Sequence, residues 1–501
     1  MKTELFRRIL ICMKKRASGI LLHITSLPGK YGIGDLGPEA FKFADFLRKS
    51  GQTYWQILPL THPNTDVSWS PYDCLSAFAG NTMLISPDLL YKSGLLDKSD
   101  IADVPGFPQT QIQFKEVYRY KTKLLNKAYE NFIPHESEKD FKLFCRENSY
   151  WLDDYTLFAA LVEKYKTSDW SKWPKIIIDE DIKLKANREK VLQFLFFRQW
   201  FSLKEYCNSY GIKFIGDIPI YVAYKSSDVW ANQDIFKLDK SKKPAFKSGV
   251  PPDYFSKTGQ LWGNPIYNWS YIKKTKYQWW MERVRQNLKL FDMVRIDHFR
   301  GLVKFWQVPA RHKTAMNGKW MPGPGEDFFK VLFRHFPDAQ LIVEDLGMIT
   351  PDVRELIKKL DLTGMKVLQF AFNDNHGKNS FLPHNHFENC VVYTGTHDNN
   401  TIRGWFSIEA SNEQKKNLFA YLGRKVPIRE LNWEMIKLAM SSVAKTAIVP
   451  VQDILNLPSD ARMNNPAKTR SNWGWRLKEK QITAKFANKL AKVTSVYGRA
   501  R

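Results

Sequence analysis

The chain has 501 residues, 44% of them hydrophobic and 25% charged, which is ordinary usage for a globular protein with a large core. No run of 18 or more apolar residues occurs, so no transmembrane helix is predicted. The net charge of +25 raises nucleic-acid binding as a hypothesis. Because the lysines and arginines are spread out, without a long block or a recognised nucleic-acid motif, a solvated basic surface is the favoured interpretation.

The cysteines and the N-terminal residues indicate a cytoplasmic protein. The five cysteines lie far apart and form no C-x-x-C pair, which is typical of reduced thiols and argues against a disulfide framework or a zinc site. Residues 1–15 mix basic and apolar side chains without a signal-peptide layout. We therefore expect them to form an N-terminal extension, with Met1 or Met13 as the start.

Eight apolar, strand-like runs alternate with helical patterns along the chain. They cover residues 18–24, 53–60, 212–222, 291–299, 341–347, 365–372, 390–398 and 446–455. Strands rich in Val, Ile and Leu that alternate with helices indicate βα units and a parallel sheet. Eight such units favour a closed (β/α)8 barrel, the TIM-barrel fold of the α/β class, over an open sheet.

The chain is about twice as long as a simple barrel, which needs about 250 residues. The surplus falls at 61–190, between the second and third predicted strands, and at 223–278, between the third and fourth. A smaller excess lies at 306–326. We predict one barrel domain spanning 1–501, with two insertion subdomains around its C-terminal face, where such barrels keep their active sites.

Polar side chains crowd the C-terminal ends of the predicted strands. Residues i and i+2 of a strand share a face, so Arg295 and Asp297 point the same way. Asp217, Glu344 and Asp398 end the third, fifth and seventh predicted strands. One such carboxylate could simply cap a helix or pair with an arginine. Several that converge on one barrel mouth indicate a catalytic site.

Two carboxyl groups that flank a bond are the apparatus of glycoside cleavage. Neighbouring strands lie about 4.8 Å apart, so Asp297 and Glu344 suit the retaining mechanism, which needs about 5–5.5 Å between carboxyls. We expect Arg295 to lower the pKa of Asp297, and an apolar setting to raise the pKa of Glu344. The 17 Trp, 21 Tyr and 33 Phe, many in Gly- and Pro-rich loops, favour a saccharide-binding surface.

With these motifs the chain resembles the amylomaltases, the 4-α-glucanotransferases of glycoside hydrolase family 77 in the α-amylase clan. The resemblance runs from about residue 16 to 478 and includes GILLHITSLPGKYGIGDLG, FIGDIPIYV, DYFSKTGQLWGNPIYNW, MVRIDHFRG, VEDLG and YTGTHDNNT. It implies transfer of a segment of an α-1,4-glucan to the 4-hydroxyl of an acceptor through a covalent glucosyl-enzyme. It also implies that catalysis needs no metal and no organic cofactor.

Carried over by motif, the resemblance makes Asp297 the nucleophile, Glu344 the general acid/base and Asp398 the transition-state stabiliser. It also implies a set of substrate-binding residues, namely Ser70, Tyr72, Asp217, Tyr254, Trp262, Asn264, Arg295, His298, His397 and Asn464. The expected partners are a glucan donor and acceptor, with no nucleic acid and no membrane. The oligomeric state stays open.

Two other functions remain as alternatives. A retaining α-glucan hydrolase would use the same carboxylates, since water and sugar compete for one intermediate, and sequence separates the two poorly. A basic nucleic-acid-binding or scaffold protein with an inactive barrel is the remote alternative, disfavoured by the intact carboxylates. The Gly-rich run at 32–37 lies too far from its strand for a dinucleotide-binding turn. His386 and its neighbours are interpreted as surface groups, not metal ligands.

Overall fold

The structure is a computed structural model that describes residues 16–66, 68–252, 256–373, 377–468 and 471–501. The predicted N-terminal extension at 1–15 therefore lies outside the described residues. Eight parallel strands form the centre of the molecule: β1 (Ala17–Leu21), β2 (Tyr54–Gln56), β3 (Lys213–Ile218), β6 (Met293–Ile296), β9 (Leu341–Val343), β10 (Gly364–Val367), β11 (Cys390–Tyr393) and β12 (Thr446–Pro450). Each lies within one of the eight predicted runs or overlaps it.

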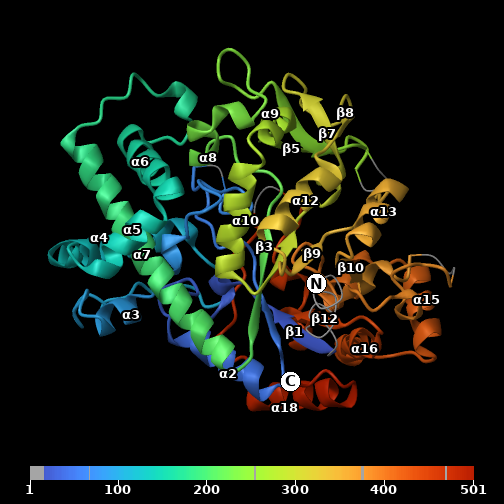
Figure 1. Cartoon of the computed structure of the whole chain (residues 1–501). Helices are drawn as coiled ribbons and strands as arrows, with labels where there is room; N and C mark the ends of the chain where they lie inside the picture. Colours follow the sequence, from blue (N-terminus) through green and yellow to red (C-terminus); the bar gives the residue numbers. More distant parts are fainter. Residues whose placement is uncertain (1–15, 67, 253–255, 374–376, 469–470) are drawn as a thin grey trace.

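The eight strands close into a barrel, which lies at the centre of the molecule among the helices (Figure 1). Their order is β10–β11–β12–β1–β2–β3–β6–β9, and every pairing is parallel. A parallel bridge from Ile342 in β9 to Thr363, directly before β10, joins the two ends of this order. The predicted (β/α)8 TIM barrel is confirmed.

Both faces of the barrel strands are buried, which explains why their sequences are nearly continuous runs of Val, Ile and Leu. Ile215, Ile342 and Ile448 pack into the barrel interior. Ile20 and Val294 point to the other face and pack against the surrounding helices. Since side chains alternate along a strand, a polar residue two positions beyond an inward-facing one points into the mouth of the barrel.

The helices outside the barrel form because their apolar residues recur with helical spacing. In α2 (Pro38–Lys49), Ala40, Phe43, Ala44 and Leu47 follow this spacing and are buried. Pro38 begins the helix, a position where its missing N–H is not needed. The other helices around the barrel are α7 (Glu180–Ser209), α10 (Gln278–Leu290), α11 (Arg300–Val303), α12 (Gly325–His335), α13 (Pro351–Lys359), α14 (Ile402–Gly404), α15 (Asn412–Leu422), α16 (Ile428–Ser441), α17 (Val451–Ile454) and α18 (Ala484–Val496).

The surplus sequence lies around the barrel in two groups (Figure 1). One group follows β2 and is helical, with α3 (Pro87–Lys92), α4 (Phe114–Phe132), α5 (Lys139–Glu147) and α6 (Ser149–Tyr165) before α7. The other follows β3 and β6 and contributes α8 (Ser227–Ala231), α9 (Trp269–Lys274), β4 (Phe246–Val250), β5 (Gln260–Pro265), β7 (Lys304–Pro309) and β8 (Lys319–Pro322). The division into subdomains at 61–190 and 223–278 stays a prediction.

The four extra strands form one antiparallel sheet in the order β5–β4–β7–β8. This sheet joins the segment after β3 to the segment after β6, which the sequence did not connect. None of the helices in the described part of the chain is both long and apolar enough to span a membrane.

Candidate active site

A cavity of about 1280 Å³ opens at the C-terminal ends of the barrel strands. Ten of the thirteen predicted site residues line it: Ser70, Tyr72, Trp262, Asn264, Asp297, His298, Glu344, His397, Asp398 and Asn464. Asp217 and Arg295 lie behind this lining, with side chains 0% and 3% exposed. Tyr254 lies outside the described residues. The volume exceeds that of a typical small-molecule pocket and suits a polymeric ligand.

Arg295, buried on β6, binds three carboxylates. Its Nη1 donates to both carboxylate oxygens of Asp217, at 2.8 and 2.6 Å, because β3 and β6 pair these residues directly. Its Nη2 donates to Asp297 Oδ1 at 3.0 Å and to Glu344 Oε2 at 2.9 Å. The planar guanidinium therefore fixes the two candidate catalytic carboxyls relative to each other.

The pKa values of Asp297 and Glu344 shift in opposite directions. Burial raises the pKa of Glu344, but Arg295 and hydrogen bonds from Asp297 and from the backbone N–H of His298 outweigh it and leave that pKa below its ordinary value. Burial, offset only in part by Arg295, and the charge of Glu344 raise the pKa of Asp297 well above its ordinary value. Of the two carboxyls, Asp297 therefore binds a proton more strongly than Glu344.

The order of these two pKa values is the reverse of the one predicted from the sequence. That prediction assumed that Arg295 acts only on Asp297 and that Glu344 lies in an apolar environment. In the structure Arg295 donates to both carboxyls, and the N–H of His298 donates to Glu344 at 2.8 Å. Hydrogen bonds to a carboxylate favour its charged form, so the extra donor reverses the expected order.

Asp398 is oriented from two sides. Asn464 Nδ2 donates to Asp398 Oδ1 at 2.6 Å, and His397 Nε2 lies 3.4 Å from the same oxygen. Arg462 donates to the backbone carbonyl of Asp398. The side chain of Asp398 is still 42% exposed. It can therefore accept hydrogen bonds from a ligand while its orientation stays fixed.

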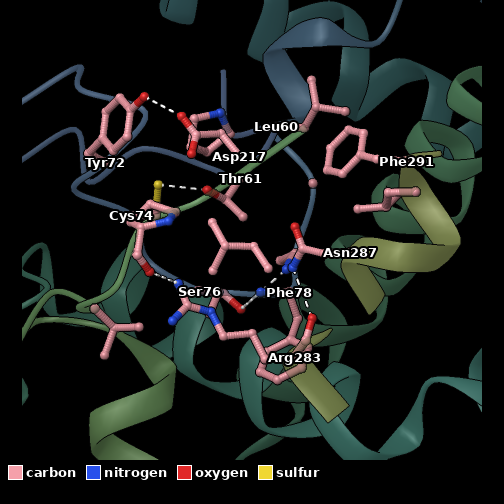
Figure 2. A pocket seen from close by; sticks show the side chains of 18 of the residues that line it. Leu60, Thr61, Tyr72, Cys74, Ser76, Phe78, Asp217, Arg283, Asn287 and Phe291 are labelled. Carbon is pink, nitrogen blue, oxygen red and sulfur yellow. Dashed lines mark hydrogen bonds between the residues drawn. The ribbon is translucent and has the colours of Figure 1, made fainter. Parts of the chain in front are cut away.

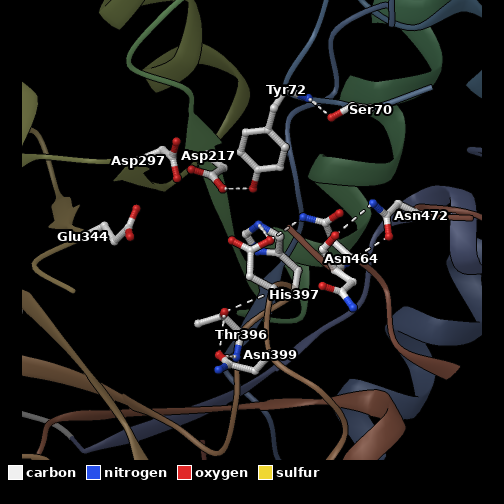
Figure 3. A network of polar contacts seen from close by, with 12 residues as sticks. Ser70, Tyr72, Asp217, Asp297, Glu344, Thr396, His397, Asn399, Asn464 and Asn472 are labelled. Carbon is white, nitrogen blue, oxygen red and sulfur yellow. Dashed lines mark hydrogen bonds and ion pairs between the residues drawn. The ribbon is translucent and has the colours of Figure 1, made fainter. Parts of the chain in front are cut away.

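Tyr72 connects Asp217 to His397 (Figure 3). Its hydroxyl donates to Asp217 Oδ2 at 2.7 Å. Its ring stacks on His397, with centroids 5.2 Å apart and planes 15° apart. The hydroxyl of Ser70 accepts from the backbone N–H of Tyr72 at 3.2 Å, which helps to fix the loop.

The wall behind Tyr72 and Asp217 is tightly packed (Figure 2). Thr61 donates to the sulfur of Cys74 at 2.8 Å, and Phe291 contributes to the same lining. The space left within this wall is about 30 Å³, which is room for only one or two water molecules. Tight packing of this kind gives Asp217 and Tyr72 little freedom to move.

The antiparallel sheet covers the other side of the cavity. Trp262 on β5 is 39% exposed and lies edge-on to His298, with ring centroids 4.8 Å apart. Asn264 donates to the carbonyl of Val222 at 3.1 Å and accepts from the hydroxyl of Ser248 at 3.3 Å. Trp262 therefore packs against the segment that follows β6, and Asn264 is held by its own sheet and by the segment that follows β3.

Sequence reasoning missed several aromatic and basic residues of the cavity. Trp69 stacks on Phe114 with centroids 4.8 Å apart, and both line the cavity. The guanidinium of Arg300 lies 4.1 Å from the centroid of Trp320, and both also line it. A signal was present for the two tryptophans, because Trp69 lies in a predicted loop that also carries a proline, and Trp320, on β8, lies in a Gly- and Pro-rich segment. Phe114 belongs to a helix, so nothing local distinguished it from a core residue.

His386 is buried, so its interpretation as a surface group is wrong. Its two ring nitrogens lie 2.7 Å from the hydroxyl of Ser442 and 2.9 Å from the carbonyl of Phe381. Burial lowers the pKa of His386 to about 4, so the ring is neutral at pH 7. Within the described ranges, His, Cys, Asp and Glu side chains form no group of three or more that could hold a metal ion.

Comparisons with known proteins identify the family. A family model described as 4-alpha-glucanotransferase, glycoside hydrolase family 77, matches residues 22–483. The chain belongs to this family.

Two curated family members are similar over their full length. The chain is 47% identical to the 4-alpha-glucanotransferase of Clostridium butyricum, over 95% of this chain and 100% of that protein. It is 45% identical to the 4-alpha-glucanotransferase of Aquifex aeolicus, over 97% of this chain and 99% of that protein.

A solved structure of the family shares the fold. It is the amylomaltase of Streptococcus agalactiae in complex with acarbose, which matches with a TM-score of 0.93 and 38% identity. The match covers 97% of this chain and 100% of that one. Both the resemblance and the fold inferred from the sequence are confirmed.

Proposed function

We propose that this chain is a 4-α-glucanotransferase that moves a segment of an α-1,4-glucan from a donor chain to the 4-hydroxyl of an acceptor sugar. The observation that carries the proposal is the pair Asp297 and Glu344, bridged by Arg295 at the mouth of a large aromatic-lined cavity. We also propose a cytoplasmic location, which the widely spaced cysteines favour.

In the first step Asp297 attacks the anomeric carbon of the donor while Glu344 protonates the glycosidic oxygen. This step requires one proton on the pair, and in the unliganded chain Asp297 is the carboxyl whose raised pKa favours holding it. As the donor enters, that proton passes to Glu344, and the ionised Asp297 keeps its hydrogen bond from Arg295. The glycosidic bond breaks, a bond to Asp297 forms, and the released chain leaves with a new 4-hydroxyl group.

In the second step the 4-hydroxyl of an acceptor attacks the glucosyl-enzyme. Glu344, now ionised, takes the hydroxyl proton, and Asp297 leaves. Asp398 accepts hydrogen bonds from sugar hydroxyls as positive charge develops on the ring, and Asn464 holds its carboxylate in place. Because the anomeric carbon is inverted twice, the product keeps the α configuration. Glu344 gives up a proton in the first step and regains one from the acceptor hydroxyl in the second.

Transfer is nearly thermoneutral, because one α-1,4 bond breaks and an equivalent bond forms. The enzyme must therefore favour a sugar hydroxyl over water as the nucleophile. Trp262, Trp320 and Trp473 line the cavity and offer ring faces to an acceptor while they reduce the access of water. Orientation of the acceptor and exclusion of water together decide the outcome of the second step.

Product analysis from pure maltotriose tests the proposal. A transferase yields glucose together with a ladder of longer chains, and the total number of reducing ends stays constant. A steady rise in reducing ends without longer chains would show that the protein is a hydrolase that uses the same carboxylates.

A further inference from the structure

Arg300 lies in the wall of the catalytic cavity but has no part in the two steps described above. It begins α11, shortly after Asp297, and it lines the cavity although only 8% of the residue is exposed. Burial of a cation costs free energy unless its N–H groups find partners, so the partners of this side chain indicate what it does.

Arg300 joins two segments that are distant in the sequence. Its Nη1 donates a hydrogen bond to the backbone carbonyl of Met348. Its guanidinium carbon lies 4.1 Å from the ring centroid of Trp320 on β8, in a cation–π contact. One side chain therefore links the segment that follows β9 to the antiparallel sheet.

The sheet side of this link is fixed by its own contacts. Trp320 is paired with Trp306 across β8 and β7, and their ring centroids are 5.2 Å apart. Nε1 of Trp306 donates to the carbonyl of Ala315 at 2.8 Å. The N–H of Gly323 donates to the carbonyl of Val303 at 2.8 Å, which ties the end of β8 to α11. Trp320 therefore forms a fixed wall.

The segment that connects Glu344 to α13 is anchored near both of its ends. Directly after Glu344, the carboxylate of Asp345 accepts from the N–H of Met365 at 2.7 Å. In the first turn of α13, Asp352 lies 2.8 Å from Lys304. These two contacts leave only the middle of the segment to be held by other groups.

The middle of this segment, residues 346–349, depends on Arg300. Leu346, Gly347 and Met348 line the cavity, and Met348 is 63% exposed. Within the described ranges, the bond from Arg300 is the only hydrogen bond to the backbone of 346–349. Without it, side-chain packing alone would hold this part of the cavity wall.

We propose that Arg300 is a positioning residue for the second step of the reaction, an inference that rests on the proposed transferase function. It holds the backbone of 346–349 near Trp320, so that this side of the cavity orients an acceptor and excludes water. Arg300 acts through the two walls that it joins. Because orientation and exclusion of water favour the acceptor, loss of the link favours water.

The first step should depend much less on Arg300. Glu344 is held by Arg295, at 2.9 Å, and by the N–H of His298, at 2.8 Å, so the acid/base stays in place without Arg300. When water attacks the glucosyl-enzyme, its oxygen bonds to the anomeric carbon, its proton passes to Glu344, and Asp297 leaves. The link therefore changes which nucleophile attacks and leaves the chemistry of the carboxyls unchanged.

A donor with a good leaving group separates the two steps. In α-maltotriosyl fluoride the carbon–fluorine bond breaks as the bond to Asp297 forms, and fluoride leaves without a proton from Glu344. The kcat/KM for fluoride release therefore reports the first step. With glucose in large excess, transfer then gives maltotetraose and hydrolysis gives maltotriose, so the ratio of these products reports the second step.

Two variants and a control test the link. Arg300→Met removes the donor and the charge, whereas Arg300→Lys keeps the charge and one group that can donate to Met348. Arg311→Met is the matched control, because Arg311 is exposed in the loop between β7 and β8 and lies outside the cavity lining. All proteins are used as the full chain.

We expect Arg300→Met to raise the ratio of maltotriose to maltotetraose roughly tenfold or more, the effect of losing one hydrogen bond from a charged donor. The kcat/KM for fluoride release should change by less than about threefold. Arg300→Lys should raise the product ratio by only about threefold, because a single donor remains. Arg311→Met should match the parent in both measurements.

An unchanged product ratio in Arg300→Met would overturn the proposal. Equal losses of fluoride release and of transfer would also overturn it, since a general structural defect lowers both. If Arg300→Met does not fold, Arg300→Lys decides, and a product ratio equal to that of the parent counts against the link. Failure of the proposed function is distinct, because the parent itself would then give maltotriose without maltotetraose.

Discussion

Two buried arginines lie at opposite ends of the barrel, and they differ in their partners. Arg295 at the mouth is 3% exposed and donates to the carboxylates of Asp217, Asp297 and Glu344. Arg499 at the floor is 0% exposed and donates only to backbone carbonyls. Its acceptors belong to Ala17, Met440, Ser442, Ala444 and Lys445, at 2.7–3.0 Å.

The different partners give the two ends of the barrel different properties. At the floor, burial and the charge of Arg16 lower the pKa of Arg499 to about 9, because neutral carbonyls only partly replace water. At the mouth, burial is outweighed by the three carboxylates, which raise the pKa of Arg295 well above its ordinary value. At the floor, the buried carbonyls are hydrogen-bonded to Arg499. At the mouth, three carboxyl groups face one guanidinium, so negative groups outnumber positive ones where the reaction takes place.

The largest effect should come from the carboxyls at the mouth. Asp297→Asn removes the nucleophile and Glu344→Gln removes the proton donor, so each should lower kcat/KM on maltotriose by roughly 10⁴-fold or more. Circular dichroism and the midpoint of thermal unfolding should stay close to those of the parent. A folded Asp297→Asn protein with near-parental activity would contradict the mechanism.

The floor should respond in stability and not in catalysis. Arg499→Met removes a donor from five buried carbonyls, of which those of Met440, Ser442 and Lys445 keep a second donor, and should lower the free energy of unfolding by roughly 3–5 kcal/mol. Denaturant unfolding measures this loss, and Arg429→Met, at an exposed position, is the control. The kcat/KM per folded molecule should stay within about twofold. A loss of activity in Arg499→Met without a loss of stability would contradict the conclusion that Arg499, unlike Arg295, has a structural role only.

Tyr72→Phe probes how far the mouth depends on its supporting hydrogen bonds. The change removes the hydroxyl that donates to Asp217 but keeps the ring that stacks on His397. Hydrogen bonds to charged groups contribute about 1.5–3 kcal/mol, so kcat/KM should fall roughly 10- to 100-fold. Tyr271→Phe, on the exposed face of α9, is the control. Unchanged kinetics in Tyr72→Phe would show that Arg295 alone fixes Asp217.

His386 should make the floor side of the fold sensitive to acid. Its pKa is about 4 in the folded chain and about 6.5 in the unfolded chain. Between these values the unfolded chain binds more protons, so this contribution to stability is lost as the pH falls from about 6.5 to about 4. Between pH 7 and pH 5 the loss should be about 2 kcal/mol.

His386→Gln isolates this contribution, because other buried histidines and carboxyls titrate equally in both proteins. Unfolding by denaturant at pH 7 and at pH 5 should show a smaller loss in the variant than in the parent. Equal losses in the two proteins would mean that His386 is not the titrating group.

The sequence by itself predicted the barrel and the polar residues at the C-terminal ends of its strands. Strand runs buried on both faces are a local signal, so all eight were recognised without knowledge of their neighbours. The i, i+2 rule placed Arg295 and Asp297 on one face for the same reason. The family motifs then named ten residues of the cavity lining, including Asn464, which lies 66 residues from its partner Asp398.

Only the tertiary structure decided which groups these residues meet. The antiparallel sheet joins β4 and β5 to β7 and β8 across the intervening β6, so no local pattern revealed it. The pKa order of Asp297 and Glu344 depends on a guanidinium shared between two strands and on the backbone N–H of His298. Strand formation follows from neighbouring residues in the sequence, whereas a pKa follows from every charge and donor nearby in space, and only folding determines those.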